Sequence, residues 1–224
     1  MKDNTETVCE QINNKMVLKR MVYKNAETCF EMFKAIAAAY PNKFKEFHPD
    51  SDIEIKYECK QRQSFHLRFG SDVLYFALHS NVFEFNRDHE VMKMPYIRED
   101  KQRSYCGMIS IYNFLSDSVQ YNRSNDVGYL IGRIFINKEK HCYIDGKREI
   151  GQVYNNFHSS VFDERLANTL FEAAIRYTVN FDLLVPPYEM VQEITVNDMM
   201  EIDNKQTPFK TGKRLGFRFQ ADIQ

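Results

Sequence analysis

The hydrophobic positions of this chain follow a helical period before residue 50 and a two-residue alternation after it. The alanine-rich segment from Ala26 to Tyr40 has apolar side chains at the spacing that places them on one side of a helix. These side chains are Phe30, Phe33, Ala37 and Tyr40. Asn25 is a candidate N-cap, and Pro41 is a candidate stop because proline disrupts helical hydrogen bonding. The pattern therefore predicts a helix near 26–40.

Between residues 53 and 86 the pattern is typical of β-strands. In 53–60 every second residue is apolar and the residues between are Glu or Lys, which predicts a strand with one face in solvent. The alternation returns in 64–69 and in 82–86, while 73–78 is continuously apolar and fits a more central strand. Together these runs predict an antiparallel meander over about 53–86.

The second half of the chain adds further strands and the strongest helix signal. Short apolar runs predict strands near 107–114, 130–144, 194–196 and 215–219. A helix is expected near 161–181, with Ser160 as its N-cap and acidic residues in its first turn. Its apolar face comprises Phe162, Leu166, Leu170, Ala174 and Tyr177.

Two glycines stand close together in the segment from Asn122 to Arg133. Gly128 and Gly132 are two of only 8 glycines in the chain, so they indicate a special backbone requirement. We interpret the segment as a tight loop that enters a strand through a β-bulge, with a close approach of the backbone to another group as the alternative.

Composition supports a folded domain. Hydrophobic residues make up 43 % and charged residues 27 % of the 224 residues, which excludes a mainly disordered chain. Glycine and proline are too scarce for a sandwich of many short strands and turns. We therefore expect a single α+β domain over 15–224, built on a mainly antiparallel sheet, and a polar, frayed N-terminus over 1–14.

The cysteine pattern indicates a cytoplasmic location, and the net charge excludes a strong electrostatic field around the whole chain. The 30 basic and 31 acidic residues leave a net charge of -1, which does not attract the whole chain to nucleic acid or to a membrane. The polar N-terminus does not resemble a secretory signal, and the longest apolar run, Val73–Leu78, is far shorter than the roughly 20 residues of a membrane helix. Five scattered cysteines form no C-x-x-C pair. We therefore expect a cytoplasmic protein with reduced thiols and no structural metal.

Motifs for catalysis are almost absent. The chain has no G-x-G-x-x-G nucleotide-binding loop and no G-x-S-x-G nucleophile elbow. We therefore predict no cofactor, no metal ligand and no catalytic residue on the basis of motifs. The densest acid-base cluster is Asp88-His89-Glu90, after a predicted strand. A metal-dependent nuclease of the ββα type would also need an Asn and a His on a following helix. Asn113 lies downstream, but no His follows it at helical spacing.

Basic residues gather on the polar faces of the predicted strands. Tyr and Phe lie between them, as a stacking platform for single-stranded nucleic acid requires. The candidate nucleic-acid-binding residues are Lys56, Lys60, Arg62, Arg68, Arg133, Lys147 and Arg148. The balanced net charge favours the simpler interpretation of a solvated sheet face.

Two functional hypotheses follow. The first is a non-enzymatic binding or accessory protein that acts through a protein–protein interface, with a protein partner or a homo-oligomer, because Phe, Tyr and Met are abundant. The alternative is a nucleic-acid-binding or nucleic-acid-processing protein that uses the basic strand faces, with a nuclease-like site around Asp88, His89 and Glu90.

Overall fold

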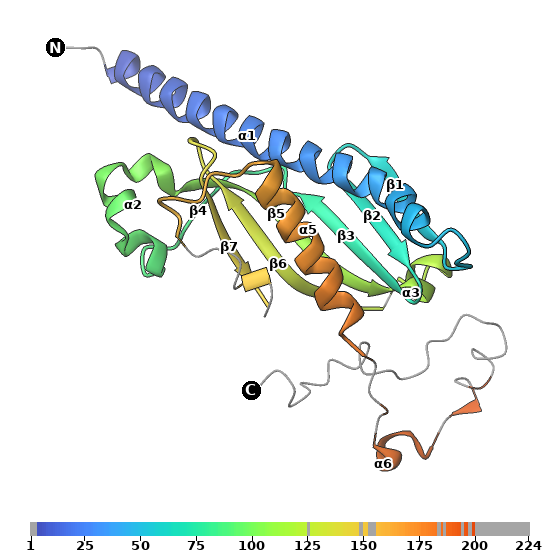
Figure 1. Cartoon of the computed structure of the whole chain (residues 1–224). Coiled ribbons are helices and arrows are strands. Elements are labelled where there is room, and N and C mark those ends of the chain that lie inside the picture. The colour runs from blue at the N-terminus through green and yellow to red at the C-terminus, as the bar shows by residue number, and fades with distance from the viewer. Residues whose placement is uncertain are drawn as a thin grey trace.

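An antiparallel sheet and two helices on one of its faces form the body of the molecule (Figure 1). The structure is a computed structural model. It describes residues 4–124, 126–147, 150–151, 156–182, 185, 187–193, 195–196 and 199. Within these residues, no helix is both long enough and apolar enough to cross a membrane.

The sheet confirms the predicted α+β fold with a mainly antiparallel sheet. Its strands are β1 (Ile55–Gln61), β2 (Ser64–Phe69), β3 (Asp72–Leu78), β4 (Phe83–Glu84), β5 (Tyr105–Leu115), β6 (Tyr129–Ile136) and β7 (Cys142–Gly146). Their order is β1-β2-β3-β5-β6-β7, and every neighbouring pair is antiparallel. The short β4 pairs with the start of β5, beyond the point where β3 ends.

The helices differ greatly in length, and the two longest lie on one face of the sheet. They are α1 (Asn4–Phe47), α2 (Pro95–Glu99), α3 (Ser116–Gln120), α5 (Glu164–Val179) and α6 (Tyr188–Val191), with 3₁₀ turns η1 (Glu90–Lys93) and η2 (Lys101–Ser104). In Figure 1, α1 and α5 lie over the same face of the sheet, and the first turns of α1 extend beyond the strands.

The main core lies between the sheet and these two helices. Phe33 of α1 contacts Phe76 of β3, with ring centroids 5.4 Å apart, and Phe162 at the start of α5, at 5.6 Å. Phe76 also stacks on Phe65 of β2 at 4.7 Å. All of these rings are buried, as the alternation in the strands and the apolar face of 161–181 predicted.

Helix α1 is much longer than the sequence pattern predicted. Residues 1–14 were expected to be frayed and a helix was expected near 26–40, but one helix runs from Asn4 to Phe47. Leu18 and Val22 are buried, so the core contact of α1 begins well before residue 26. Polar composition alone does not reveal this contact, because the partner side chains come from distant strands.

Pro41 was expected to stop the helix, and it lies inside α1 instead. A proline in a helix interior costs roughly 3 kcal/mol through its missing N–H and its ring. The residue before it is held by a tertiary contact, since the Tyr40 ring lies 5.6 Å from the Phe171 ring of α5. We attribute the continuation of the helix in part to this contact.

Two other details differ from the sequence prediction, and a third cannot be compared with it. The N-cap of α5 is Asp163, whose carboxylate accepts a hydrogen bond from the Leu166 N–H at 2.7 Å, and not Ser160. Ser160 donates its hydroxyl to the Asn156 carbonyl. Of the strand expected near 194–196, residues 195 and 196 are described and neither is in a strand, and the strand expected near 215–219 lies outside the described residues.

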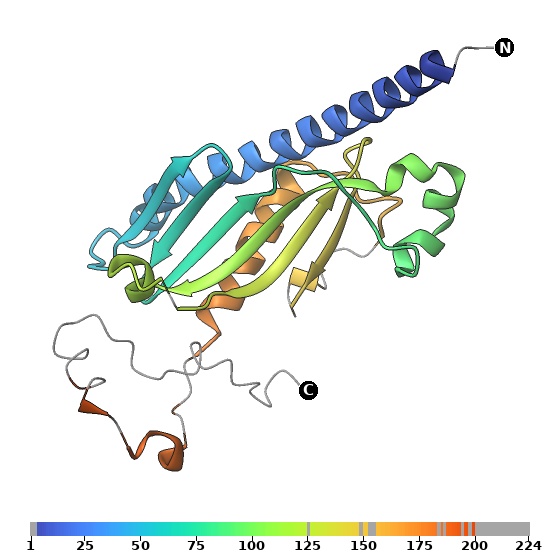
Figure 2. The ribbon, with the colours of Figure 1, turned by 180° about the vertical axis from the view of Figure 1, so that it is seen from behind.

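The second face of the sheet is only partly covered. Residues 85–104 cross one end of it and form a smaller apolar cluster with the strands. The cluster comprises Val91, Tyr96, Ile97, Cys106, Phe135, Tyr143 and Phe157. Figure 2 shows that no long helix lies across the remaining strands on this side, and that the short α3 lies at one end of them. We call this uncovered part, over β1, β2, β3 and the far half of β5, the open sheet face.

The bulge predicted around the paired glycines is confirmed. The register between β5 and β6 shifts where Ile111 pairs with Gly132 and Tyr112 pairs with Leu130. Gly128, just before β6, lies against Phe114, and a Cβ built there would come 2.4 Å from its ring. The segment therefore contains both features that the sequence suggested, a β-bulge and a close approach of the backbone to another group.

Candidate functional site

The open sheet face carries a row of side chains that runs across four strands. Glu58 of β1 pairs with His66 of β2, His66 with Tyr75 of β3, and Tyr75 with Tyr112 of β5. Residues directly opposite each other in antiparallel strands point to the same side, so these groups are neighbours. Each of them is partly exposed.

The structure brings together only some of the predicted nucleic-acid-binding residues. Lys56 and Arg68 are direct neighbours on the open sheet face. Arg133 is on the same face but lies on β6, three strands away from β2. Lys147 is exposed just after β7, and residue 148 lies outside the described residues.

Carboxylates accompany most of these cations. Lys56 pairs with Glu54 at 2.7 Å, Lys60 with Glu58 at 3.6 Å, Arg62 with Glu27 of α1 at 2.8 Å, and Arg133 with Asp145 of β7. Arg68 donates to the Gln120 side-chain oxygen at 3.3 Å. Exposed ion pairs contribute little to stability, but they reduce the local positive charge available to a phosphate.

The Asp88-His89-Glu90 cluster has local structural contacts. The His89 Nδ1 accepts a hydrogen bond from the Val91 N–H at 3.2 Å and so caps η1. The Glu90 carboxylate accepts from the Tyr143 hydroxyl at 2.7 Å. Asn113, the downstream residue of the nuclease hypothesis, pairs with Leu74 and is buried toward the helices, on the other side of the sheet. No group of three His, Cys, Asp or Glu side chains in the described residues is arranged to hold a metal ion.

A partly buried polar network surrounds Tyr96 of α2. Its hydroxyl donates to Glu139 at 2.8 Å and accepts from the Asn137 side chain at 2.9 Å. Arg103 binds Glu139 at 3.0 Å and lies over the Tyr96 ring. These groups satisfy one another, and they fix the turn between β6 and β7 against α2 rather than presenting groups to a substrate.

A groove between α1 and α5 has a volume of about 660 Å³. It is lined by Ile36, Tyr40, Lys43, Phe44, Glu46, Phe47, His48, Asn168, Phe171 and Glu172. A second cavity of about 320 Å³ continues it along α5 and shares Tyr40 and Glu172. The two form one groove, which we call the α1–α5 groove.

The α1–α5 groove combines an apolar floor with charged edges. Tyr40 and Phe171 meet edge to face at 5.6 Å on its floor, and Phe47 at its end is 80 % exposed. Burial, together with the nearby Glu172 carboxylate, raises the pKa of Tyr40, so its hydroxyl stays protonated and can donate a hydrogen bond. The charged edges consist of Lys43, Glu46, Glu172 and Arg176.

The sequence pattern did not predict this groove. It ended the first helix at Pro41, so Phe44 and Phe47 were not recognised as a continuation of the face that carries Tyr40. The four-residue spacing from Tyr40 to Phe44 was the available signal. No pattern in the sequence indicates that α5 lies beside this end of α1.

Comparison of the chain with protein-family models, with curated proteins and with solved structures finds no match to any of them.

Proposed function

We propose that this protein is a non-enzymatic binding protein that holds an amphipathic helix of a partner protein in the α1–α5 groove. The observation that carries the proposal is the apolar floor of Tyr40, Phe44 and Phe171 between two helices. Recognition of a helix in a groove uses such floors to bury the apolar face of the incoming helix. A cytoplasmic location, where thiols stay reduced, belongs to the same proposal.

The dimensions of the groove suit a helix. Its lining comes from two helices and the residues that directly follow them, His48 and Asn180, so an added helix would complete a three-helix layer over the sheet. The part of α5 that lines the groove runs from Asn168 to Val179, and at about 1.5 Å per residue it offers roughly 18 Å of contact. An incoming helix of about three turns matches this length.

The edges of the groove specify the charges of the partner. Lys43 and Arg176 favour acidic residues beside the apolar face of the incoming helix, and Glu46 and Glu172 favour basic residues. We therefore expect a partner helix with both signs of charge flanking apolar residues at i, i+3 or i+4, and i+7.

A displayed library of helical peptides of about 16 residues tests the proposal with the full-length chain. Enriched peptides should carry the apolar spacing described above. Phe47→Glu places a charge at an exposed position of the groove and should weaken their binding by roughly tenfold or more. Val17→Glu makes the same change at an exposed position of α1 away from the groove and should leave binding unchanged. Enrichment of no peptide, or equal binding by the Phe47→Glu variant, would refute the proposal.

Single-stranded nucleic acid on the open sheet face is the second candidate. The adjacent rings of Tyr75 and Tyr112, with Arg68 nearby, favour it, because bases stack on such rings. It predicts that a labelled oligonucleotide binds with steep salt dependence and is released by Tyr75→Ala with Tyr112→Ala, but not by Tyr121→Ala, an exposed tyrosine after α3. The nuclease version further predicts Mg²⁺-dependent cleavage that His89→Ala abolishes. Absence of binding at about 50 mM salt would exclude both versions.

A further inference from the structure

The two ends of the sheet differ in how their outer strands are covered. At β7, the Cys142 N–H donates a hydrogen bond to the Ser160 carbonyl at 2.8 Å, so a later segment of the chain covers the start of this strand. At the other end, β1 pairs with β2, and no other strand or bridge of the described residues pairs with it. Figure 1 shows β1 as the outermost strand on its side. We call its unpaired side the β1 edge. Such an edge exposes backbone N–H and C=O groups that can pair with another strand.

Helix α1 leaves the helix side of β1 partly open. Phe30 of α1 contacts Phe65 of β2, with ring centroids 5.3 Å apart, and Phe65 is buried. Ile55 and Tyr57 of β1 point to the same side of the sheet and remain partly exposed. We conclude that α1 packs mainly over β2, which leaves space above β1 for the side chains of an added strand.

The charges of β1 are complementary to those of the same strand reversed. Consider two β1 strands that are antiparallel, with Tyr57 of one opposite Tyr57 of the other. Lys56 of each copy then lies directly opposite Glu58 of the other. These side chains all point to the open sheet face, because directly opposite residues of antiparallel strands share a face. Charged residues further from Tyr57 continue the match, since residues at equal distance from it form the pairs Glu54–Lys60 and Asp52–Arg62.

The alternation of charge also specifies the register. A shift of the centre by one residue toward either end places Lys56 opposite Lys56 or Glu58 opposite Glu58, and like charges directly opposite each other are destabilising. Intermediate registers pair side chains that point to opposite faces of the sheet. Lys56 already lies opposite the cation Arg68 on β2, so an acidic residue on its other side is favourable. Its ammonium group has three donors, and its ion pair with Glu54 therefore does not prevent a second one.

We infer that two copies of this chain pair through their β1 edges, antiparallel about Tyr57, and so join their sheets into one. The two-fold axis is perpendicular to the sheet, which keeps both open sheet faces on one side and both helix layers on the other. Ile55 of each copy lies opposite Cys59 of the other on the helix side. The pairing does not use the α1–α5 groove, so the inference does not rest on the proposed function.

The paired segment is short. The register between β1 and β2 shifts between Glu58 and Gln61, and such a bulge ends regular pairing. Residues 55–59 remain, and five residues at about 3.4 Å per residue span roughly 17 Å. The interface is therefore much smaller than the standard size of about 1,600 Å². We expect a dissociation constant of the order of 100 μM, and a dimer that is visible only at high protein concentration.

Sedimentation velocity of the full-length chain tests the dimer, over concentrations from about 5 to about 500 μM. Lys56→Glu places carboxylates opposite each other, and Glu58→Lys places ammonium groups opposite each other. Each variant alone should raise the dissociation constant by roughly tenfold or more. An equimolar mixture of the two variants has opposite charges at both pairs again, and it should form a heterodimer about as strong as the wild-type dimer.

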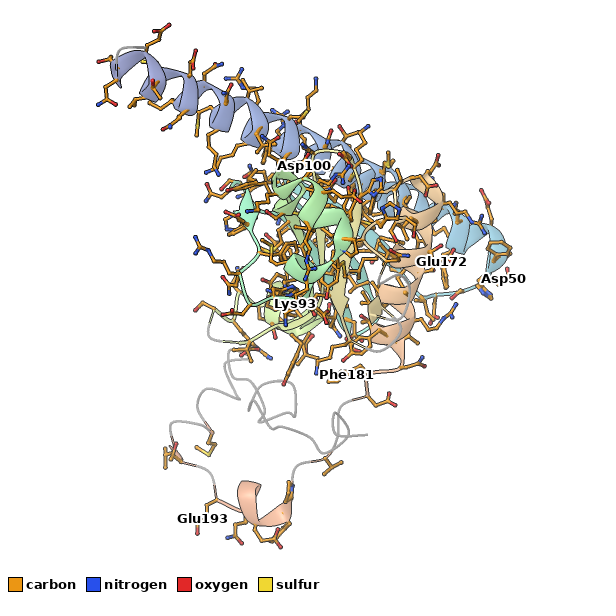
Figure 3. The ribbon with its side chains drawn as sticks, turned by 90° about the vertical axis from the view of Figure 1, so that its left-hand side faces the viewer. Asp50, Lys93, Asp100, Glu172, Phe181 and Glu193 are labelled. Atoms are coloured by element: carbon orange, nitrogen blue, oxygen red, sulfur yellow. The ribbon has the colours of Figure 1, made fainter. Side chains whose placement is uncertain are left out.

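Lys93→Glu is the matched control. Lys93 is exposed on η1, and Figure 3 shows it well apart from Asp50, which lies shortly before β1. This variant should leave the dissociation constant unchanged. A wild type that is monomeric throughout the concentration range, or a mixture that associates no more strongly than the single variants, would overturn the inference.

Cross-linking tests the register. In a background with Cys9→Ser and Cys59→Ser, which removes the exposed thiols, a mixture of the Lys56→Cys and Glu58→Cys variants should form a disulfide-linked dimer under mild oxidation. Either variant alone should not, because its two new thiols are not opposite each other. Equal cross-linking by one variant alone would contradict the register. Lys56→Glu should not affect peptide capture by the α1–α5 groove, so this inference and the proposed function can fail separately.

Discussion

Gly107 of β5 lies directly against Ala26 of α1, at the point where the long helix crosses the sheet. A Cβ built on Gly107 would come within 2.4 Å of the Ala26 Cβ, closer than two carbon atoms can approach. A glycine and an alanine at this crossing let the helix backbone lie close to the strand. The close crossing allows the larger side chains on either side, Val22 and Phe30, to be buried completely.

Gly107→Ala should therefore destabilise the fold by about 1–3 kcal/mol through overpacking. Adding Ala26→Gly removes the opposing methyl group, so the double variant should be less destabilised than the sum of the two single changes. Urea unfolding of all four proteins measures this coupling. Strict additivity would show that the two residues do not limit the approach of helix and strand.

Leu170 lies fully buried at the middle of α5. Leu170→Ala should reduce the free energy of unfolding by about 2–5 kcal/mol, because the change leaves a cavity between α5 and the sheet. Thr169→Ala, on the exposed side of the same turn, should change it by no more than about 0.5 kcal/mol. Equal effects of the two substitutions on the free energy of unfolding would contradict the assignment of Leu170 to the buried face of α5.

The five cysteines should differ in reactivity. All are free; Cys9 and Cys59 are exposed, whereas Cys29, Cys106 and Cys142 are buried. Burial raises the pKa of both Cys29 and Cys142 to about 12 and that of Cys106 well above its ordinary value, so their reactive thiolates are scarce at neutral pH. A thiol reagent should modify two residues rapidly in the folded protein and five after unfolding without reductant. Fewer than five after unfolding would indicate a disulfide.

His66 should make the fold sensitive to mild acid. Burial lowers its pKa below the ordinary value of 6.5, although Glu58, 3.5 Å from its Nε2, acts in the opposite direction. As the pH falls below 6.5, the unfolded chain therefore binds the proton before the folded chain does, and stability is lost down to the folded-state pKa.

Comparison with His66→Gln isolates this contribution from that of the carboxylates. The wild type should lose more stability than the variant between pH 7 and pH 5, measured by thermal or urea unfolding. A wild type that gains stability relative to the variant on acidification would mean that the Glu58 carboxylate outweighs burial.

Local periodicity was sufficient to predict β1, β2, β3 and α5. In Ile55–Gln61 and Ser64–Phe69, alternate residues face the core and the open sheet face, and this two-residue period is present in the amino-acid order itself. The apolar face of α5 and the bulge beside Gly132 were predicted for the same reason, since each depends on residues close together in the chain.

Tertiary structure alone decided the length of α1 and the α1–α5 groove. Pro41 lies within the helix, and the adjacent Tyr40 contacts Phe171, a residue 131 positions away, which no local rule includes. Likewise, the cations of the predicted nucleic-acid face met carboxylates such as Glu27 and Asp145, which come from other elements. The amino-acid order determines which side chains each element can bury or expose. Which of them meet depends on packing between elements far apart in the chain, and it is this packing that created the candidate site.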